Sequence, residues 1–158
     1  MAAAFLSLFS FPITVSASDC PAHWWFRFCG RVENNTPWTV KWAEFGKGSE
    51  SCFIYNYNNG DGSTGWSPAS GYWLTCDQHN LAAGKGKGGY DDRVDVDGIT
   101  HDRKWVIIWQ NGHREELGPR QWAKISSGEW ATCTAADGVT PVCRVKCNTP
   151  FNKECIGA

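Results

Sequence analysis

Eight cysteines follow an apolar N-terminal segment, and this combination constrains the fold more than any other feature of the sequence. Residues 1–17 carry no charged side chain and end in Val-Ser-Ala, the small-residue pattern at which signal peptides are cleaved. The alternative is a membrane anchor, but the apolar run is shorter than the roughly 20 residues that a spanning helix needs. We therefore predict a cleaved signal peptide over residues 1–17 and a single secreted, extracellular β domain over residues 18–158.

An even number of cysteines behind a signal peptide predicts disulfides formed in an oxidising compartment. An Asp-Gly turn signal at residues 137–138 separates two short β-prone runs. A three-residue loop over residues 137–139 would place Cys133 directly opposite Cys143 on paired strands. We predict a disulfide between these two cysteines.

A second disulfide is predicted between Cys52 and Cys76. The other four cysteines are expected to join the N-terminal segment to the C-terminal one: Cys20, Cys29, Cys147 and Cys155. A structural zinc site would require paired ligands at short spacing, and the chain has no Cys-x-x-Cys. We therefore expect neither a bound zinc ion nor another cofactor.

The hydrophobic pattern is that of β-strands. Turn-forming residues recur at short intervals, with β-branched and aromatic runs between them. In residues 38–45, Val40 and Trp42 share one face while Lys41 lies on the other. Capped helical periodicity is absent, apart from a short helical turn expected near residues 76–82. The sequence predicts an all-β fold, a single disulfide-stapled β-sandwich or compact barrel of about eight or nine strands.

An Asn-Gly dipeptide at residues 111–112 follows the apolar run 105–109 and is a strong hairpin signal. A two-residue turn at this dipeptide would place Ile108 opposite Glu115. On the second strand of this hairpin, His113 and Glu115 would share a face.

The stretch "GKGKGGYDDRVDVDG", residues 84–98, contains a formal G-x-G-x-x-G match. A nucleotide-binding loop would lead into a helix, whereas a strand-like pattern follows here, so we do not assign a phosphate site. The aspartates of this stretch could ligate calcium, or Asp95 and Asp97 could form the solvent-facing side of a strand with Val94 and Val96 inward. We favour the strand, with Asp91 and Asp92 at its start.

Catalytic motifs of the common hydrolases are missing: the chain has neither G-x-S-x-G nor H-E-x-x-H. His113 with Glu115 is the candidate acid-base pair. A pair of carboxylates from Asp91, Asp92, Asp95 and Asp97 is the candidate for a glycosidase mechanism. A small secreted hydrolase, of ribonuclease or glycosidase type, is therefore the alternative to a binding protein.

Ten tryptophans are more than a core of this size needs. Six of them lie in strand patterns and are expected in the core: Trp38, Trp42, Trp105, Trp109, Trp122 and Trp130. The aromatic residues beside loop signals are predicted to bind a ligand: Trp24, Trp25, Tyr55, Tyr57, Trp66, Tyr72 and Trp73. Aromatic rings beside Asn, Asp and Ser are typical of glycan-binding surfaces, and the same rings also anchor protein partners. Residues 55–66 are the leading contact region, and a turn with packed aromatics is the alternative.

The net charge and an Asn-x-Thr sequence lead to expectations about the partner and about glycosylation. The net charge of −1 argues against nucleic acid as the partner, because a dedicated polyanion binder concentrates basic residues. Asn34 begins an Asn-x-Thr acceptor at an expected strand edge, so this asparagine is the predicted glycosylation site.

The segment "VENNTPWTVKW" resembles the first strand of thaumatin-like proteins over about a dozen residues. That family has more cysteines and a longer chain, so its function is not carried over. In overall plan, the signal peptide, eight cysteines, β pattern and aromatic loops resemble small secreted cysteine-rich microbial proteins of the fungal effector and killer-toxin-like kinds. "DVDGIT" and "GEWATC" are the most distinctive local stretches, and the resemblance implies no catalytic residue.

Together these observations predict a secreted, non-enzymatic binding protein that acts at a cell surface or cell wall as an effector, toxin or defence factor. The expected partner is a surface or wall glycan or protein, bound through loop aromatics. Stable membrane insertion is not expected, although a membrane-active toxin is a third hypothesis, which predicts leakage of lipid vesicles.

Overall fold

The computed structural model describes residues 22–23, 26–27, 29–56, 71–90 and 92–147. The predicted signal peptide, residues 1–17, lies outside these ranges. All the regular structure in them is β: β1 Ala22–His23, β2 Phe26–Arg27, β3 Arg31–Asn35, β4 Val40–Ile54, β5 Tyr72–Leu81, β6 Lys85–Gly88, β7 Gly98–His101, β8 Trp105–Ile108, β9 Arg114–Leu117, β10 Gln121–Lys124, β11 Glu129–Ala136 and β12 Thr140–Cys147. The predicted all-β class is confirmed.

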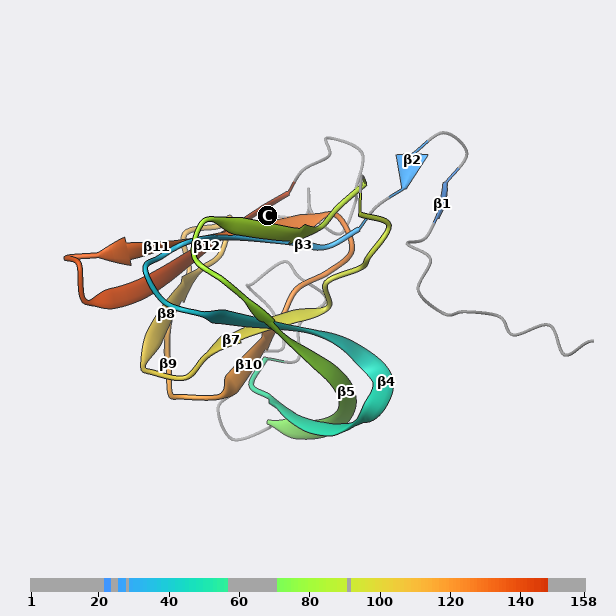
Figure 1. Ribbon diagram of the computed structural model, residues 1–158, viewed down its shortest axis with the longest axis horizontal. Coiled ribbons are helices and arrows are strands. Elements are labelled where there is room, and N and C mark those ends of the chain that lie inside the picture. The colour runs from blue at the N-terminus through green and yellow to red at the C-terminus, as the bar shows by residue number, and fades with distance from the viewer. Residues whose placement is uncertain (1–21, 24–25, 28, 57–70, 91, 148–158) are drawn as a thin grey trace, which may run out of the picture.

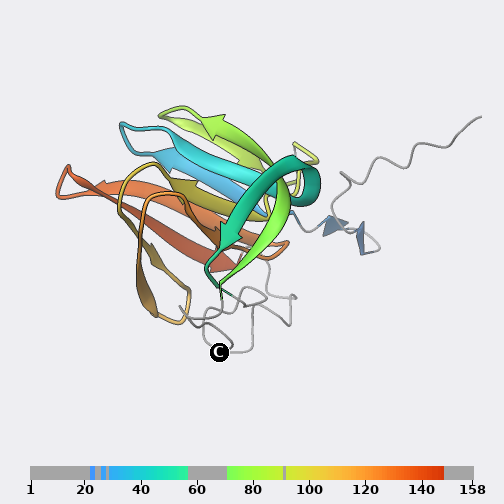
Figure 2. The same ribbon diagram turned by 90° about the horizontal axis from the view of Figure 1, so that it is seen from below.

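Ten of these strands form two sheets, and β1 and β2 pair separately. One sheet has six strands in the order β6-β3-β11-β12-β8-β9, and the other has four in the order β10-β7-β4-β5. Figures 1 and 2 show the sheets from two directions, with β4 and β5 curling together at one end of the molecule. Of the two predicted architectures, the sandwich fits, and the described strands form no closed barrel.

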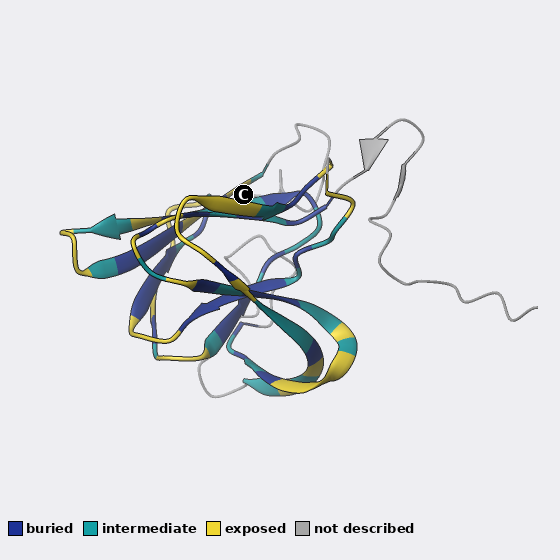
Figure 3. Cartoon of the chain, in the orientation of Figure 1, coloured by how far each residue is buried: buried dark blue, intermediate teal, exposed yellow. Residues whose placement is uncertain are grey.

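The main core lies between the two sheets, where the dark blue positions of Figure 3 meet. The six-stranded sheet contributes Val32, Trp105, Ile107, Ala131 and Val145, and the four-stranded sheet contributes Val40, Trp42, Ile99 and Ala123. Burial of these apolar side chains is the main stabilising term, at about 25 cal/mol per Å² removed from water. Among the described residues there is no helix with the length and hydropathy to cross a bilayer.

The hairpin of β11 and β12 confirms the first predicted disulfide. Ala136 pairs with Thr140 across a three-residue loop, and Cys133 lies directly opposite Cys143, to which it is bonded. Asp137 at the start of this loop has a φ of 56°, a conformation that aspartate tolerates better than most residues. The Asp-Gly turn therefore fixes the register that brings the two sulfur atoms together.

The four-stranded sheet is curled by an irregularity in β4. Cys76 of β5 faces both Phe45 and Glu50, so the residues between these two bulge out of the ladder. The curl lets β10 pair with β7 and also with the end of β4. Inside the curl, the predicted disulfide between Cys52 and Cys76 is confirmed, and it packs against Trp122 in a second, smaller core.

Two local predictions are wrong. The expected helical turn near residues 76–82 is part of β5, because this segment pairs with β4 along its whole length. The hairpin at residues 111–112 exists, but its loop has three residues instead of two: the amide of Trp109 donates to the carbonyl of His113 at 2.9 Å. Glu115 is consequently opposite Ile107, an inward-facing residue, and not opposite Ile108.

Residues 92–97 link the two sheets and do not form the predicted strand. Asp95 accepts hydrogen bonds from the Gly30 amide at 2.5 Å and the Ser127 hydroxyl at 2.6 Å. Asp97 accepts one from the Phe45 amide of β4 at 2.8 Å. The expected solvent-facing role of these two aspartates is therefore wrong, because both carboxylates bind the backbone or side chains of neighbouring segments.

Candidate functional site

Among the predicted contact residues that the structure describes, Trp73 on β5 is the most exposed. Its side chain is 67% exposed, and its ring centroid lies 5.2 Å from that of Phe53, the residue directly opposite on β4. The two rings are tilted by 54°. We call this pair the aromatic surface. Covering a large exposed aromatic side chain with a ligand removes apolar surface from water, which favours binding, so Trp73 is a natural contact point for a ligand.

Polar residues and a glycine complete the aromatic surface. Ser51 lies opposite Thr75, two positions along the same strands, and both residues are exposed. A Cβ at Gly71 would lie 2.3 Å from the ring of Phe53, so a larger residue there would displace the ring. The surface thus combines two aromatic rings with two hydroxyl groups, the combination that can stack on a sugar and hydrogen-bond to it.

The other predicted contact residues are distributed differently. Tyr55 is half-buried against the main core, and Tyr72 is half-buried against the smaller core around Cys52. Tyr57, Trp66, Trp24 and Trp25 lie outside the described residues. The structure therefore brings Trp73 together with Phe53, which the sequence analysis did not single out, and gives Tyr55 and Tyr72 a packing role.

Trp130 was expected in the core, but it faces outward from the six-stranded sheet. It is half-buried, and the guanidinium of Arg31 lies 5.2 Å from its ring centroid. The signal for this was in the sequence, because Cys133 faces inward and positions an odd number of residues away on a strand face the opposite side. Trp42, Trp105, Trp109 and Trp122 are buried as expected, while Trp38 is half-buried beneath Arg103.

The candidate acid-base pair does form a contact: the imidazole of His113 is hydrogen-bonded to the carboxylate of Glu115. The Glu115 side chain is only 13% exposed because the three-residue loop turns it inward. The space beside it is lined by Tyr55, Asn56, Ile107, Trp109, Leu117 and Ala123, and these side chains leave no room for even a water molecule. The described side chains therefore leave no cavity on the inner side of the Glu115 carboxylate.

Burial has changed the acidity of Asp97. Its pKa is raised to about 6, first by desolvation and further by the negative charges of Asp95 and Glu44, while the hydrogen bond from Phe45 acts in the opposite direction. A raised carboxyl pKa in a cleft can mark an acid catalyst. Here the carboxylate accepts the hydrogen bond of the Phe45 amide, so its role is to hold the segment before β7 against β4 within the four-stranded sheet.

A metal site is not formed by the described aspartates. No group of three or more His, Cys, Asp or Glu side chains in the described ranges is arranged to hold a metal ion. Asp92 accepts a hydrogen bond from the Gly88 amide at 3.0 Å and lies 3.5 Å from the ammonium of Lys87. Asp91 lies outside the described residues. The glycine-rich segment itself is the edge strand β6, paired with β3.

Asn34 is a buried structural residue. It is fully buried, its amide nitrogen donates to the carbonyls of Trp38 at 2.7 Å and Leu81 at 2.9 Å, and its oxygen accepts from the amide and hydroxyl of Thr36. A glycan on this nitrogen would remove hydrogen bonds that a buried amide needs. The expected exposure at Asn34 is therefore wrong, and glycosylation of this residue stays a prediction.

The remaining cysteines agree with an oxidised protein. Cys29 and Cys147 are also disulfide-bonded, and no described cysteine is a free thiol. Cys20 and Cys155 lie outside the described residues. Buried disulfides in both sheets fit an oxidising compartment such as the extracellular space. In comparisons with protein-family models, curated proteins and solved structures, no match to this chain was found.

Proposed function

We propose that this protein is a secreted, non-enzymatic binding protein that acts at a cell surface or cell wall and recognises a glycan through the aromatic surface. The observation that carries the proposal is the exposure of Trp73, which places an indole in water beside Phe53. Exposed large apolar residues grouped with hydroxyl groups are characteristic of binding surfaces. Ser51 and Thr75 supply those hydroxyls on the adjacent pair of positions.

The location of the aromatic surface supports this role. Trp73 and Phe53 lie near the ends of β5 and β4 that residues 55–71 connect in the chain, and this segment includes residues 55–66, the predicted contact region. Behind the rings, the disulfide between Cys52 and Cys76 fixes the two strands. A surface held rigid before binding loses little conformational entropy when a ligand attaches.

A binding role is favoured over a hydrolase. The His113–Glu115 pair has the right groups for acid-base chemistry, but side chains fill the space around its carboxylate. The alternative predicts turnover of RNA or polysaccharide that disappears in Glu115→Gln. Binding without turnover by the wild-type protein supports the proposal, whereas turnover that depends on Glu115 would replace it.

The decisive experiment measures binding of the wild-type protein and of Trp73→Ala to a broad glycan array and to insoluble chitin and glucan. We expect Trp73→Ala to weaken binding by about tenfold or more, because stacking on one indole contributes about 1–3 kcal/mol by analogy with other ring-stacking ligands. Tyr90→Ala is the matched control, since Tyr90 is 63% exposed but lies outside the aromatic surface. Blank arrays and pull-downs for the wild type, or equal loss in both variants, would refute the proposal.

A further inference from the structure

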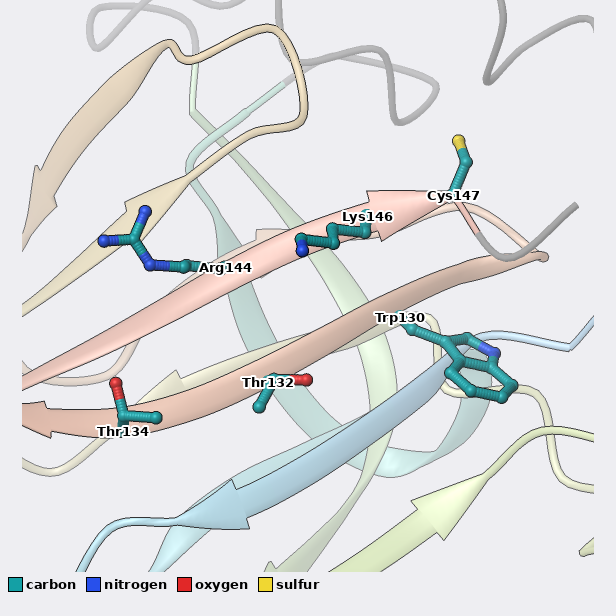
Figure 4. Close-up of a pocket in the computed structure, with 6 residues that line it drawn as sticks. All are labelled: Trp130, Thr132, Thr134, Arg144, Lys146 and Cys147. Atoms are coloured by element: carbon teal, nitrogen blue, oxygen red, sulfur yellow. The ribbon is translucent and has the colours of Figure 1, made fainter. Parts of the chain in front are cut away.

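A row of basic side chains crosses the outer face of the six-stranded sheet. Trp130 of β11 lies opposite Lys146 of β12, and Thr132 lies opposite Arg144. Figure 4 shows the side chains of these neighbouring strands on one face of the sheet. They line a shallow depression of about 370 Å³, whose lining residues are Trp130, Thr132, Thr134, Arg144, Lys146 and Cys147.

A second depression continues this face across β8 and β9. Ile108 pairs with Arg144 on one side and with Arg114 on the other, so the two arginines lie on the same face with one strand between them. The second depression has a volume of about 410 Å³, and Lys104 and Arg114 line it together with Glu116. We call Arg31, Lys104, Arg114, Arg144 and Lys146 the basic strip.

The charge of the basic strip is only partly compensated. Arg31 pairs with Glu33 at 3.2 Å and Arg114 pairs with Glu116 at 2.9 Å. Arg144 and Lys146 are exposed and form no ion pair or side-chain hydrogen bond with another described residue. The chain as a whole has a net charge of −1, so the positive charge on this face is a local concentration that the total conceals.

We propose that the basic strip binds an acidic polysaccharide, one that carries carboxylate or sulfate groups. Guanidinium groups form paired hydrogen bonds with such anions, and the threonine hydroxyls of β11 can bind sugar hydroxyls. From β3, which carries Arg31, to β9, which carries Arg114, the strip spans four strand spacings, or about 19 Å. That length suits several units of a polymer and is more than a single small anion would occupy.

The strip suits a polysaccharide better than a single-stranded nucleic acid. Sheets that bind single strands present several aromatic rings on which successive bases stack. At the two depressions, Trp130 is half-buried beside Arg31, and the other aromatic residue, Trp105, is 1% exposed. This face would therefore attract a ligand mainly through its positive charge, and the polar groups beside that charge are hydroxyls.

The test measures the affinity of the full secreted protein for immobilised heparin, polygalacturonate, neutral dextran and single-stranded RNA. We expect binding to one or both acidic polysaccharides, none to dextran, and release by salt because exposed charges are screened. Arg144→Gln/Lys146→Gln should weaken this binding by about tenfold or more. Lys85→Gln/Arg93→Gln is the matched control, because it removes the same amount of charge from two exposed residues outside the strip that form no ion pair with a described residue. This variant should change the affinity for the acidic polysaccharides less than about twofold.

The proposal would be overturned by no retention of the wild type on either acidic polysaccharide, by equal loss in the two double variants, or by tighter binding to RNA than to the polysaccharides. A longer polygalacturonate should also bind more tightly than the monomeric acid, and equal affinities would indicate a small-anion site instead. The proposal is independent of the aromatic surface. Trp73→Ala should keep its affinity for acidic polysaccharides, so either proposal can fail without the other.

Discussion

The two sheets carry different surfaces and are built with different regularity. In the six-stranded sheet, β11 and β12 pair over eight consecutive positions without interruption, and the outer face carries the basic strip. In the four-stranded sheet, β4 bulges between Phe45 and Glu50 and curls around a second core, and the outer face carries Trp73 and Phe53. Asp97 and His101, the two described residues whose pKa values are shifted, also belong to the four-stranded sheet and its edge.

The difference shows how a small sandwich can present two kinds of outer surface. A regular ladder places alternate residues of several strands on one plane, which suits an extended array of charges. A curled pair of strands encloses apolar side chains on its inside and leaves its outside convex, which suits a few prominent rings. Phe45, where the bulge begins, donates its amide hydrogen bond to the Asp97 carboxylate just before β7.

The largest expected effect concerns the disulfide in each sheet. Cys52–Cys76 closes 24 residues and Cys133–Cys143 closes 10. By chain entropy, removal of the first as an Ala pair should cost roughly 3–3.5 kcal/mol and removal of the second roughly 2.5–3 kcal/mol. Urea unfolding of the two double variants measures both values. An equal or larger loss for the Cys133–Cys143 pair would show that the regular sheet depends on its disulfide as much as the curled one.

A smaller effect is expected from Asp97→Asn. The folded pKa of Asp97 is about 6 and the ordinary value is 3.8, so the folded state binds the proton more tightly. The carboxyl group therefore stabilises the fold below pH 3.8 relative to neutral pH, and this contribution is lost as the pH rises through 6. Asparagine imitates the protonated form, so the variant should be more stable by about 1–3 kcal/mol at pH 7.

Thermal or urea unfolding of the wild type and of Asp97→Asn between pH 3.5 and 7 measures this difference in stability. The gain over the wild type should shrink as the pH falls and vanish near the lower end. Asp95→Asn is a useful comparison, because Asp95 also accepts a hydrogen bond from a backbone amide, that of Gly30. A loss of stability in Asp97→Asn at pH 7 would mean that the Phe45 amide needs the charged carboxylate as its hydrogen-bond acceptor.

The smallest expected effect comes from His101 at the end of β7. Its side chain is 2% exposed, and its pKa is lowered, first by burial and further by the positive charge of Arg103. Neither ring nitrogen has a hydrogen-bond partner among the described residues. The rings of His101 and Trp38 are arranged edge to face, with 6.2 Å between their centroids. The uncharged ring therefore fits the site better than the charged one.

A lowered folded pKa means that stability is present above the ordinary value of 6.5 and is lost as the pH falls below it. The slope can reach about 1.4 kcal/mol per pH unit for one proton. His101→Phe should remove this loss, whatever its effect at neutral pH. Amide exchange should place the acid sensitivity in β4 and β7, and equal weakening of β11 and β12 would contradict the comparison between the sheets.

Several features of the molecule could be predicted from local sequence because they depend on short-range geometry. The alternation in β4, the Asp-Gly loop and the pairing of Cys133 with Cys143 follow from turn length and strand period. The hairpin at residues 109–113 was found by the same reasoning, but its register was wrong by one residue. Gly112 takes a φ of 84° at the end of a three-residue loop, which an Asn-Gly pair permits as readily as a two-residue turn.

Local patterns in the sequence were enough to predict the class of the fold, two disulfides and the residue types from which a binding surface can be made. The tertiary structure alone decided where those residues lie. Asp95 binds the segments that contain Gly30 and Ser127, and Asp97 binds the Phe45 amide of β4. Asn34 is buried, and Trp130 lies with Arg144 on an outer face. The physical reason is that a period of two assigns residues to two faces, whereas long-range pairing decides which face meets the core and which strands become neighbours.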